Sequence, residues 1–143
     1  MKSIHPYLTF SGNCKQVMKF YQSCLGGKLS LQYVGDTDLA ENLPAKMKNC
    51  ILQAILKTDN LMLYGTDMTG DNGLLKGNNI SLLLHCKTEN EIKGYYKSLS
   101  RSGKQTHPLK ETYHGNIFGG LTDKFGNHWL LSYEKKQRRK VLS

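Results

Sequence analysis

The thiols and imidazoles that could take part in chemistry are scattered along this chain of 143 residues. Its four cysteines, Cys14, Cys24, Cys50 and Cys86, include no C-x-x-C pair of the kind that binds zinc or exchanges disulfides. Free cysteine is commonly a small buried apolar residue, and the cytosol keeps such thiols reduced. We therefore expect these cysteines to fill space in a core.

The other candidates for catalysis are histidines and carboxylates. Nucleophilic catalysis needs Ser, Cys or Thr beside an activating base, and general acid–base catalysis needs titratable groups that converge on one place. The spacing of Ser, Cys and His shows no such pair. Several carboxylates fall in expected turns: Asp36, Asp38, Asp67, Asp71 and Asp123. The sequence therefore names no catalytic residue.

Part of the formal net charge of +9 lies in a basic C-terminal tail, residues 135–143. Nucleic-acid binding usually combines basic residues on a shaped surface with aromatic platforms, and this tail has none interleaved. We expect a solvated terminus and no nucleic-acid partner. No apolar run approaches the roughly 20 residues that cross a bilayer, and no secretory signal opens the chain. We expect a cytoplasmic protein with no membrane partner.

The first half of the chain has the pattern of one helix among four strands. Apolar residues recur at helical spacing between Asn13, a plausible N-cap, and Gly26, a plausible stop. Strands are expected at residues 4–10, 28–34, 50–56 and 61–64, with Asp59 and Asn60 as the last hairpin turn. The predicted order is β-α-β-β-β.

The second half repeats this order after a Gly-rich polar segment, residues 65–79. A strand at 80–86 leads to a capping box of Thr88 and Glu91, which predicts the start of a helix. Strands follow near Thr106 and at 116–122 and 128–133. The aromatic pairs Phe20-Tyr21 and Tyr95-Tyr96 stand about 75 residues apart, as in a weak internal repeat.

Two longer stretches carry a family resemblance. PYLTF at 6–10, followed by Gly12-Asn13, Phe20-Tyr21 and Gly26-Gly27, resembles the opening of PhnB-like proteins. PLKETYHGNIFGGLTDKFGNHW at 108–129 resembles their closing signature. PhnB-like proteins are a branch of the vicinal oxygen chelate superfamily, which includes glyoxalases, bleomycin-resistance proteins and extradiol dioxygenases.

This resemblance implies an α+β fold of two βαβββ modules whose mixed sheets curve into half-barrels, the glyoxalase-like fold. The expected single domain spans residues 1–134, with module one at about 1–66 and module two at about 79–134. The basic tail, 135–143, follows it. The resemblance also implies a homodimer and a cleft that binds a small molecule.

Metal-dependent members of the superfamily take ligands from three strands, and the matching positions here are His5, Asn79 and Leu130. Only His5 is a good ligand, because an amide oxygen binds zinc-class metals weakly and leucine does not bind them. We predict no cofactor. The alternative is a divalent metal (Zn, Ni, Mn or Mg) at a non-standard site on which His5, His114 and His128 converge.

The resemblance and strand parity together give a set of ligand-pocket residues: His5, Tyr7, Asn79, Tyr113, His114 and His128. Trp129 and Phe125 are expected in the core instead. The simpler interpretation of the histidines is structural: His128 caps a strand edge, His114 is a surface loop residue and His5 forms a hydrogen bond inside the cleft. Tyr113, on a loop, is as readily explained by simple packing.

Two functions fit these observations. The first is a metal-independent small-molecule-binding protein, as for resistance proteins that sequester drugs. The alternative is a metal-dependent lyase, isomerase or transferase built on His5. The sequence leaves open whether the protein is an enzyme, and a nucleic-acid-associated module is the third and least supported hypothesis.

Overall fold

A computed structural model describes residues 2–135. The chain divides into two compact units, Met1–Lys76 and Gly77–Ser143. Each unit has the order β-α-β-β-β and a four-stranded mixed sheet, which confirms the predicted α+β class and its two βαβββ modules. Apart from Lys135, the predicted basic tail lies outside the described residues.

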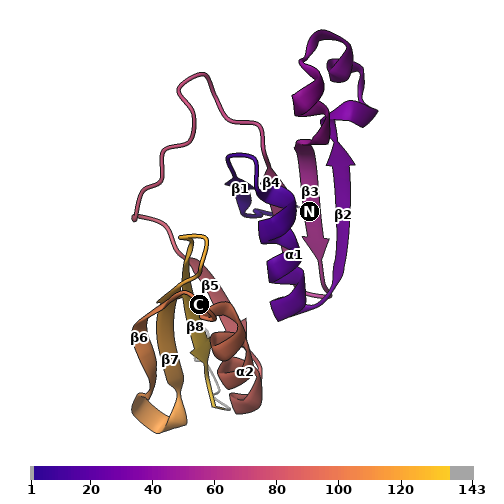
Figure 1. Ribbon diagram of the computed structural model, residues 1–143. Coiled ribbons are helices and arrows are strands. Elements are labelled where there is room, and N and C mark those ends of the chain that lie inside the picture. Colours follow the sequence, from indigo (N-terminus) through magenta and orange to yellow (C-terminus); the bar gives the residue numbers. More distant parts are fainter. Residues whose placement is uncertain (1, 136–143) are drawn as a thin grey trace. The chain divides into compact units, whose positions relative to one another are not determined.

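The first unit is a sheet with one helix on it (Figure 1). Its elements are β1 (Tyr7–Thr9), α1 (Cys14–Leu25), β2 (Lys28–Tyr33), β3 (Ile51–Lys57) and β4 (Met62–Thr66). The strand order is β1-β4-β3-β2, with β1 parallel to β4 and the other pairs antiparallel. Three 3-10 turns, η1 (Val34–Asp36), η2 (Asp38–Asn42) and η3 (Ala45–Asn49), connect β2 to β3. The first strand is shorter than the predicted 4–10.

Helix α1 starts and ends at the predicted residues, but its N-terminus is capped differently. Asn13 stands at the N-cap position, as predicted, but its side chain makes no capping hydrogen bond. Asp67, directly after β4, accepts the N–H of Cys14 through Oδ1 at 2.9 Å and the N–H of Ile51 through Oδ2 at 2.8 Å. A carboxylate is favourable at a helix N-terminus. Gly26, with φ +76°, ends the helix as predicted.

The second unit repeats the arrangement with its own residues. Its elements are β5 (Leu82–Cys86), α2 (Glu89–Leu99), β6 (Lys104–Glu111), η4 (Tyr113–Gly115), β7 (Ile117–Thr122) and β8 (His128–Tyr133). The strand order is β5-β8-β7-β6, and β5 runs parallel to β8. Strand β6 is longer than the short strand predicted near Thr106, and its register against β7 shifts on both sides of His107.

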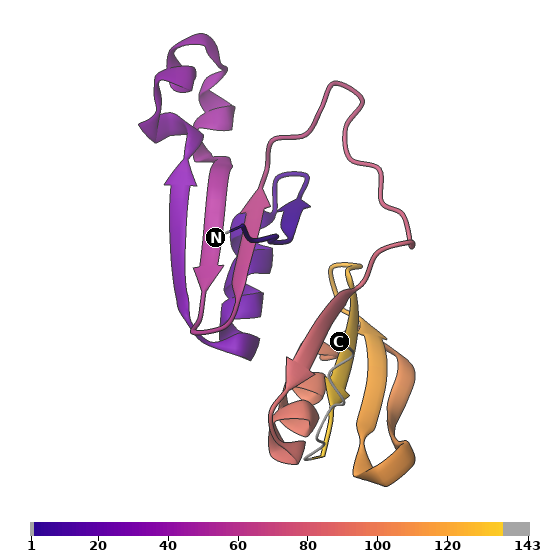
Figure 2. The ribbon, with the colours of Figure 1, turned by 180° about the vertical axis from the view of Figure 1, so that it is seen from behind.

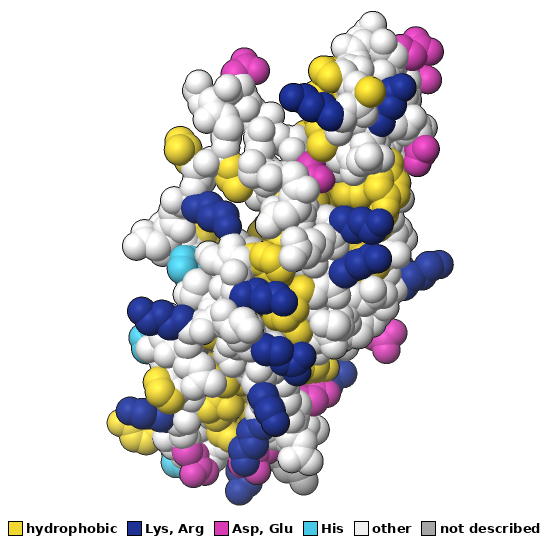
Figure 3. Space-filling view, in the orientation of Figure 1, with side chains coloured by type: hydrophobic (Ala, Val, Ile, Leu, Met, Phe, Trp, Pro, Cys, Tyr) yellow, Lys and Arg dark blue, Asp and Glu magenta, His cyan; other side chains and the backbone are white. Residues whose placement is uncertain are grey.

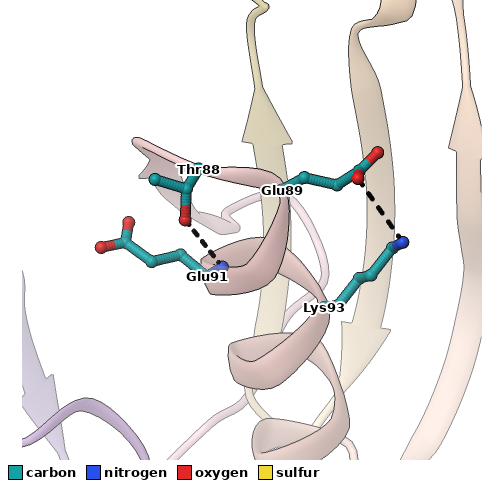
Figure 4. A network of polar contacts seen from close by, with 4 residues as sticks. All are labelled: Thr88, Glu89, Glu91 and Lys93. Carbon is teal, nitrogen blue, oxygen red and sulfur yellow. Dashed lines mark hydrogen bonds and ion pairs between the residues drawn. The ribbon is translucent and has the colours of Figure 1, made fainter.

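The capping box at the start of α2 is confirmed in its main contact (Figure 4). The N–H of Glu91 donates to Oγ1 of Thr88 at 3.0 Å. The Glu91 carboxylate accepts the N–H of Lys87 at 2.8 Å, one residue before the Thr88 N–H that a standard capping box uses. Glu89 and Lys93 form an exposed ion pair at 3.8 Å on the next turn.

Trp129 lies in the core of the second unit, as predicted. Its indole Nε1–H donates to Oδ2 of Asp123 at 3.0 Å, and Oδ1 of Asp123 accepts the N–H groups of Phe125 and Asn127. The Asp123 carboxylate is itself buried and holds the β7–β8 turn. Phe125 is only half-buried, so its assignment to the core is wrong. It sits in the turn itself, with Nζ of Lys124 5.3 Å from the centroid of its ring.

Each helix covers one side of its own sheet (Figures 1 and 2). In the first unit, a side chain added at Gly65 would meet Phe10, Cys14 and Met18, so Gly65 faces α1. Neighbouring strand residues alternate between faces, so Tyr64 points to the other side. We call these uncovered sides the open faces of the two sheets. Within residues 2–135, no helix is long and apolar enough to cross a membrane.

Candidate functional site

The open face of the first sheet carries a pair of stacked tyrosines. Tyr7 on β1 pairs in register with Tyr64 on β4, so both side chains lie on one face. Their ring centroids are 5.8 Å apart and the rings are inclined by only 10°. Tyr7 remains 54% exposed. A flat aromatic surface is therefore available on this face.

Two polar side chains, His5 and Gln53, lie beside this tyrosine pair. The ring of His5 lies 5.8 Å from that of Tyr64, tilted by 41°, and its Nε2 is 2.9 Å from Oγ of Ser3. The hydroxyl of Tyr7 donates to Oε1 of Gln53 at 3.5 Å. The structure thus brings the predicted pocket residues His5 and Tyr7 together. Tyr64, which joins them, was missed.

The open face of the second sheet carries histidines from three strands. Nδ1 of His128 on β8 lies 2.9 Å from Oγ1 of Thr122 on β7, the residue that it pairs with. Nδ1 of His85 on β5 lies 2.9 Å from Oγ of Ser132, also its partner in register. His107 on β6 pairs with Gly120, and a Cβ on Gly120 would come 3.1 Å from its Nδ1. His85 and His107 were missed because neither carries a motif.

The other predicted pocket residues lie in connections rather than on a sheet. Asn79 is exposed in the segment before β5. Tyr113 and His114 belong to η4, where Tyr113 is 85% exposed and His114 adopts a left-handed φ of +60°. That conformation is uncommon outside glycine.

His114 and His128 stand at opposite ends of strand β7. His114 precedes its first residue, Ile117, and His128 pairs with its last, Thr122. Five residue steps along a strand span about 16 Å. Ligands of one zinc-class ion each lie about 2 Å from it, so these two imidazoles do not share an ion within this unit.

The residues at the three matching positions do not form a ligand set of the kind that holds a divalent metal in the superfamily. Leu130, the third matching position, pairs with Leu83 and Gly120 and so lies in an apolar row. His5 has Ser3 and Tyr64 as its polar and aromatic neighbours. Among residues 2–135, no three or more His, Cys, Asp or Glu side chains are grouped so that they could hold a metal ion.

The buried thiols are poor nucleophiles. Burial, followed by the charge of Asp67, raises the pKa of Cys14 to about 12. Burial, followed by the charge of Glu91, raises the pKa of Cys86 to about 11. Because the thiolate is the reactive form, both groups stay inert near neutral pH. Cys24 and Cys50 are half-buried, so they fill core space less completely than expected.

A broad depression of about 410 Å³ lies elsewhere on the first unit. It is lined by Leu25, Gly27, Lys28, Lys57, Thr58 and Asp59. Lys28 and Lys57 are directly opposite in the β2–β3 ladder, and like charges in that position repel. In the view of Figure 3, Lys and Arg side chains are spread over the surface rather than gathered in one continuous patch.

Comparison with known proteins gives a family match over most of the chain. The family described as 3-demethylubiquinone-9 3-methyltransferase matches residues 2–132. The protein YjdN of Escherichia coli is 29% identical over 144 residues, which cover 94% of this chain and 97% of YjdN.

Solved structures give the same relationship. Protein PA1353 of Pseudomonas aeruginosa superimposes with a TM-score of 0.81 at 29% identity, covering 95% of this chain and 100% of that one. The PhnB protein of Bacillus cereus, which carries the same methyltransferase description, has a TM-score of 0.72 at 26% identity, covering 93% and 100%. A glyoxalase/bleomycin resistance protein/dioxygenase family enzyme of Burkholderia phytofirmans shares the fold, with a TM-score of 0.59 at 12% identity over 89% and 95%.

Proposed function

Since the chain belongs to the 3-demethylubiquinone-9 3-methyltransferase family, with its PhnB-like relatives and glyoxalase-type fold, we propose that it is a small-molecule-binding protein that needs no metal. Its ligand is a planar molecule that stacks on Tyr7 and Tyr64. The stacked tyrosine pair, of which Tyr7 is exposed, is the observation that carries this proposal.

The geometry of the pair favours a flat ligand over a compact one. Aromatic pairs with centroids 4.5–7 Å apart contribute about 0.5–1.5 kcal/mol beyond the area that they bury. A ligand ring on Tyr7 extends a stack that already exists, so little side-chain freedom is lost on binding. The amide of Gln53, beside the Tyr7 hydroxyl, supplies a hydrogen-bonding group at the edge of the stack.

The family description names a methyl transfer, which the fold does not favour. Nucleotide-type cofactors are usually held by a Gly-rich loop between a strand and the N-terminus of a helix. In the described part of the chain, the β1–α1 connection has Gly12 as its single glycine, and Lys87-Thr88 connects β5 to α2. We therefore propose binding rather than methyl transfer.

We further propose that the protein acts as a homodimer. Large apolar side chains stand exposed outside the sheets, among them Ile4, Leu75 and Ile80. A second chain that covers them would remove this surface from water. Sedimentation equilibrium at micromolar concentration should give twice the chain mass, and a monomer at all concentrations would reject the dimer.

We assign the protein to the cytoplasm. All four cysteines are free in the structure, and two of them are buried. Reduced thiols are the normal state in the cytosol, whereas exported proteins commonly pair theirs. Fractionation of cells that express the chain, with a periplasmic or secreted marker as reference, tests this assignment.

Binding of planar compounds to the full chain tests the proposed function. A set of fused-ring heteroaromatic compounds is screened by chemical shift perturbation, before and after treatment with a chelator. We expect hits that shift the amides of β1 and β4 and that bind equally after chelation. Tyr64→Leu should weaken such hits about tenfold. Tyr33→Leu, in the same sheet but facing α1, where Lys15 lies 5.5 Å from its ring, should not.

Two results would reject the proposal. One is a chain that binds planar compounds only after loading with zinc, nickel or manganese, with loss of metal in His5→Ala. That result would favour the metal-dependent lyase, isomerase or transferase instead. The other is equal loss of binding in the Tyr64 and Tyr33 variants, which would point to general damage to the fold.

A further inference from the structure

The open face of the second sheet has a composition that the proposed stacking function leaves unexplained. Three imidazoles reach this face from β5, β6 and β8, although their positions in the sequence, 85, 107 and 128, share no motif. Register brings them there, since each pairs with a residue of the same face. Three such residues on one sheet face indicate a shared role.

Two of these imidazoles are held by hydroxyl groups. Nδ1 of His85 contacts Oγ of Ser132, and Nδ1 of His128 contacts Oγ1 of Thr122, both at 2.9 Å. A hydroxyl that donates to Nδ1 leaves the ring proton on Nε2. Each ring then presents an N–H donor, and it presents the same donor when it is protonated. Nε2 of these residues suits a negatively charged oxygen.

The charged residues of this face have one sign. Lys110 pairs with Phe118, and Lys104 pairs with Thr122, so the Cβ atoms of both lysines lie on the histidine-bearing face. Within the described strands of this unit, the one carboxylate is Glu111, and it pairs with buried Ile117 on the helix side. Glu134 follows after β8 has ended. Cationic and imidazole groups without a carboxylate between them favour an anion.

The centre of the same face is apolar. Leu83 is 62% exposed and Phe118 is 41% exposed, and Leu130 lies between Leu83 and Gly120 in the sheet. Gly120 has no side chain on this face, and a Cβ there would come 3.0 Å from Cδ2 of Leu130. Apolar side chains are thus surrounded by groups that bind an anion.

We propose that this face binds an organic carboxylate with a flat apolar body. The body lies on Leu83, Leu130 and Phe118, and the carboxylate accepts a hydrogen bond from Nε2 of His85 or of His128, which stand at the two ends of this apolar centre because their register positions on β8 are four residues apart. Lys104 and Lys110 add long-range attraction. This site is made by residues of the second unit and the tyrosine pair by residues of the first, and the proposal does not depend on whether that pair binds a ligand.

Three isosteric probes test the charge requirement on the full chain. They are 2-naphthoate, the neutral 2-naphthalenemethanol and the cationic 2-naphthylmethylammonium. We expect 2-naphthoate to shift the amides of β5, β7 and β8 and to bind at least tenfold more tightly than the other two. Equal binding of all three, or shifts confined to the first unit, would overturn the proposal.

Variants separate this site from the tyrosine pair and from the overall charge. The double variant His85→Gln, His128→Gln should weaken 2-naphthoate about tenfold while its amide spectrum keeps the dispersion of a folded chain. Tyr64→Leu should leave 2-naphthoate unchanged. Lys93→Gln, on α2, and deletion of residues 136–143 lower the net charge without changing the proposed contacts and should also leave the affinity for 2-naphthoate unchanged.

For each control there is an outcome that would contradict the proposed site. If Lys93→Gln or the deletion weakens 2-naphthoate as much as the double variant does, binding reflects net charge and the proposed site is wrong. If Tyr64→Leu alone abolishes it, the anion binds at the tyrosine pair. A folded double variant with unchanged affinity also overturns the proposal.

Discussion

The carboxylate of Asp67 accepts the backbone N–H of Cys14, 53 residues earlier in the chain, at 2.9 Å. Its second oxygen accepts the N–H of Ile51 at the start of β3. One side chain thus joins the N-terminus of α1 to two strands of the same sheet. These bonds hold α1 against the sheet whose strands β1 and β4 carry Tyr7 and Tyr64.

Replacing Asp67 with alanine should destabilise the first unit by about 2–3 kcal/mol, because two N–H groups lose a charged acceptor. Urea unfolding followed by the amide signals of α1 and β3 measures the loss. Asp71→Ala, an exposed carboxylate four residues later, is the matched control and should change stability by less than about 0.5 kcal/mol. Equal effects of the two variants would contradict the capping role.

The raised pKa of the Cys14 thiol predicts that the folded state loses stability at alkaline pH. Its pKa is raised from 9.0 to about 12 in the folded chain, so between these values the folded state keeps a proton that the unfolded state has lost. The contribution of this thiol to the free energy of unfolding should therefore be fully present below pH 9. It should decrease as pH rises through this window. The slope from this group is at most about 1.4 kcal/mol per pH unit.

Cys14→Ala isolates this contribution from that of other groups that titrate in alkali. Its unfolding free energy should decline less steeply above pH 9 than that of the unmodified chain, whatever its value at neutral pH. Cys50→Ala, at a half-buried position, should keep the steeper decline. Parallel curves for the unmodified chain and Cys14→Ala would show that the buried thiol is not the cause.

The sequence predicted local elements well and non-local neighbours poorly. The bounds of α1, the stop at Gly26 and the Thr88 cap depend on residues near one another in the chain, and all three are confirmed. Asn13 stands at the predicted N-cap position but makes no side-chain cap, whereas Asp67, far away in sequence, accepts the N–H of Cys14. Local patterns carry no information about such a distant partner.

The candidate sites show the same limit. Alternation along a strand correctly grouped Tyr7 with His5, and His128 with Leu130. The partners Tyr64, Ser132 and His85 depend on the register of the parallel pairs β1–β4 and β5–β8. More than 40 residues separate these strands, and no turn between them fixes the register. Asn79, Tyr113 and His114 were placed by resemblance and lie in connections.

The Thr88 cap should stabilise α2 measurably. Thr88→Ala removes the acceptor for the N–H of Glu91 and should cost about 1 kcal/mol. Glu89→Gln breaks only the exposed ion pair with Lys93 and should cost about 0.5 kcal/mol or less. Native-state hydrogen exchange in α2 distinguishes the two, and a larger effect of Glu89→Gln would refute this ranking.

Trp129 is the single tryptophan of the chain, so its fluorescence reports on the second unit alone. Asp123→Asn should destabilise this unit by about 1–3 kcal/mol. The Asp123 carboxylate accepts three N–H groups, from Trp129, Phe125 and Asn127, and an amide replaces one accepting oxygen with a donor. Urea unfolding monitored by Trp129 emission measures the shift.

Asp36→Asn, an exposed carboxylate of the first unit, should leave that transition unchanged. An Asp123→Asn transition at the same urea concentration as the unmodified chain would mean that the buried carboxylate does not hold the β7–β8 turn that carries His128.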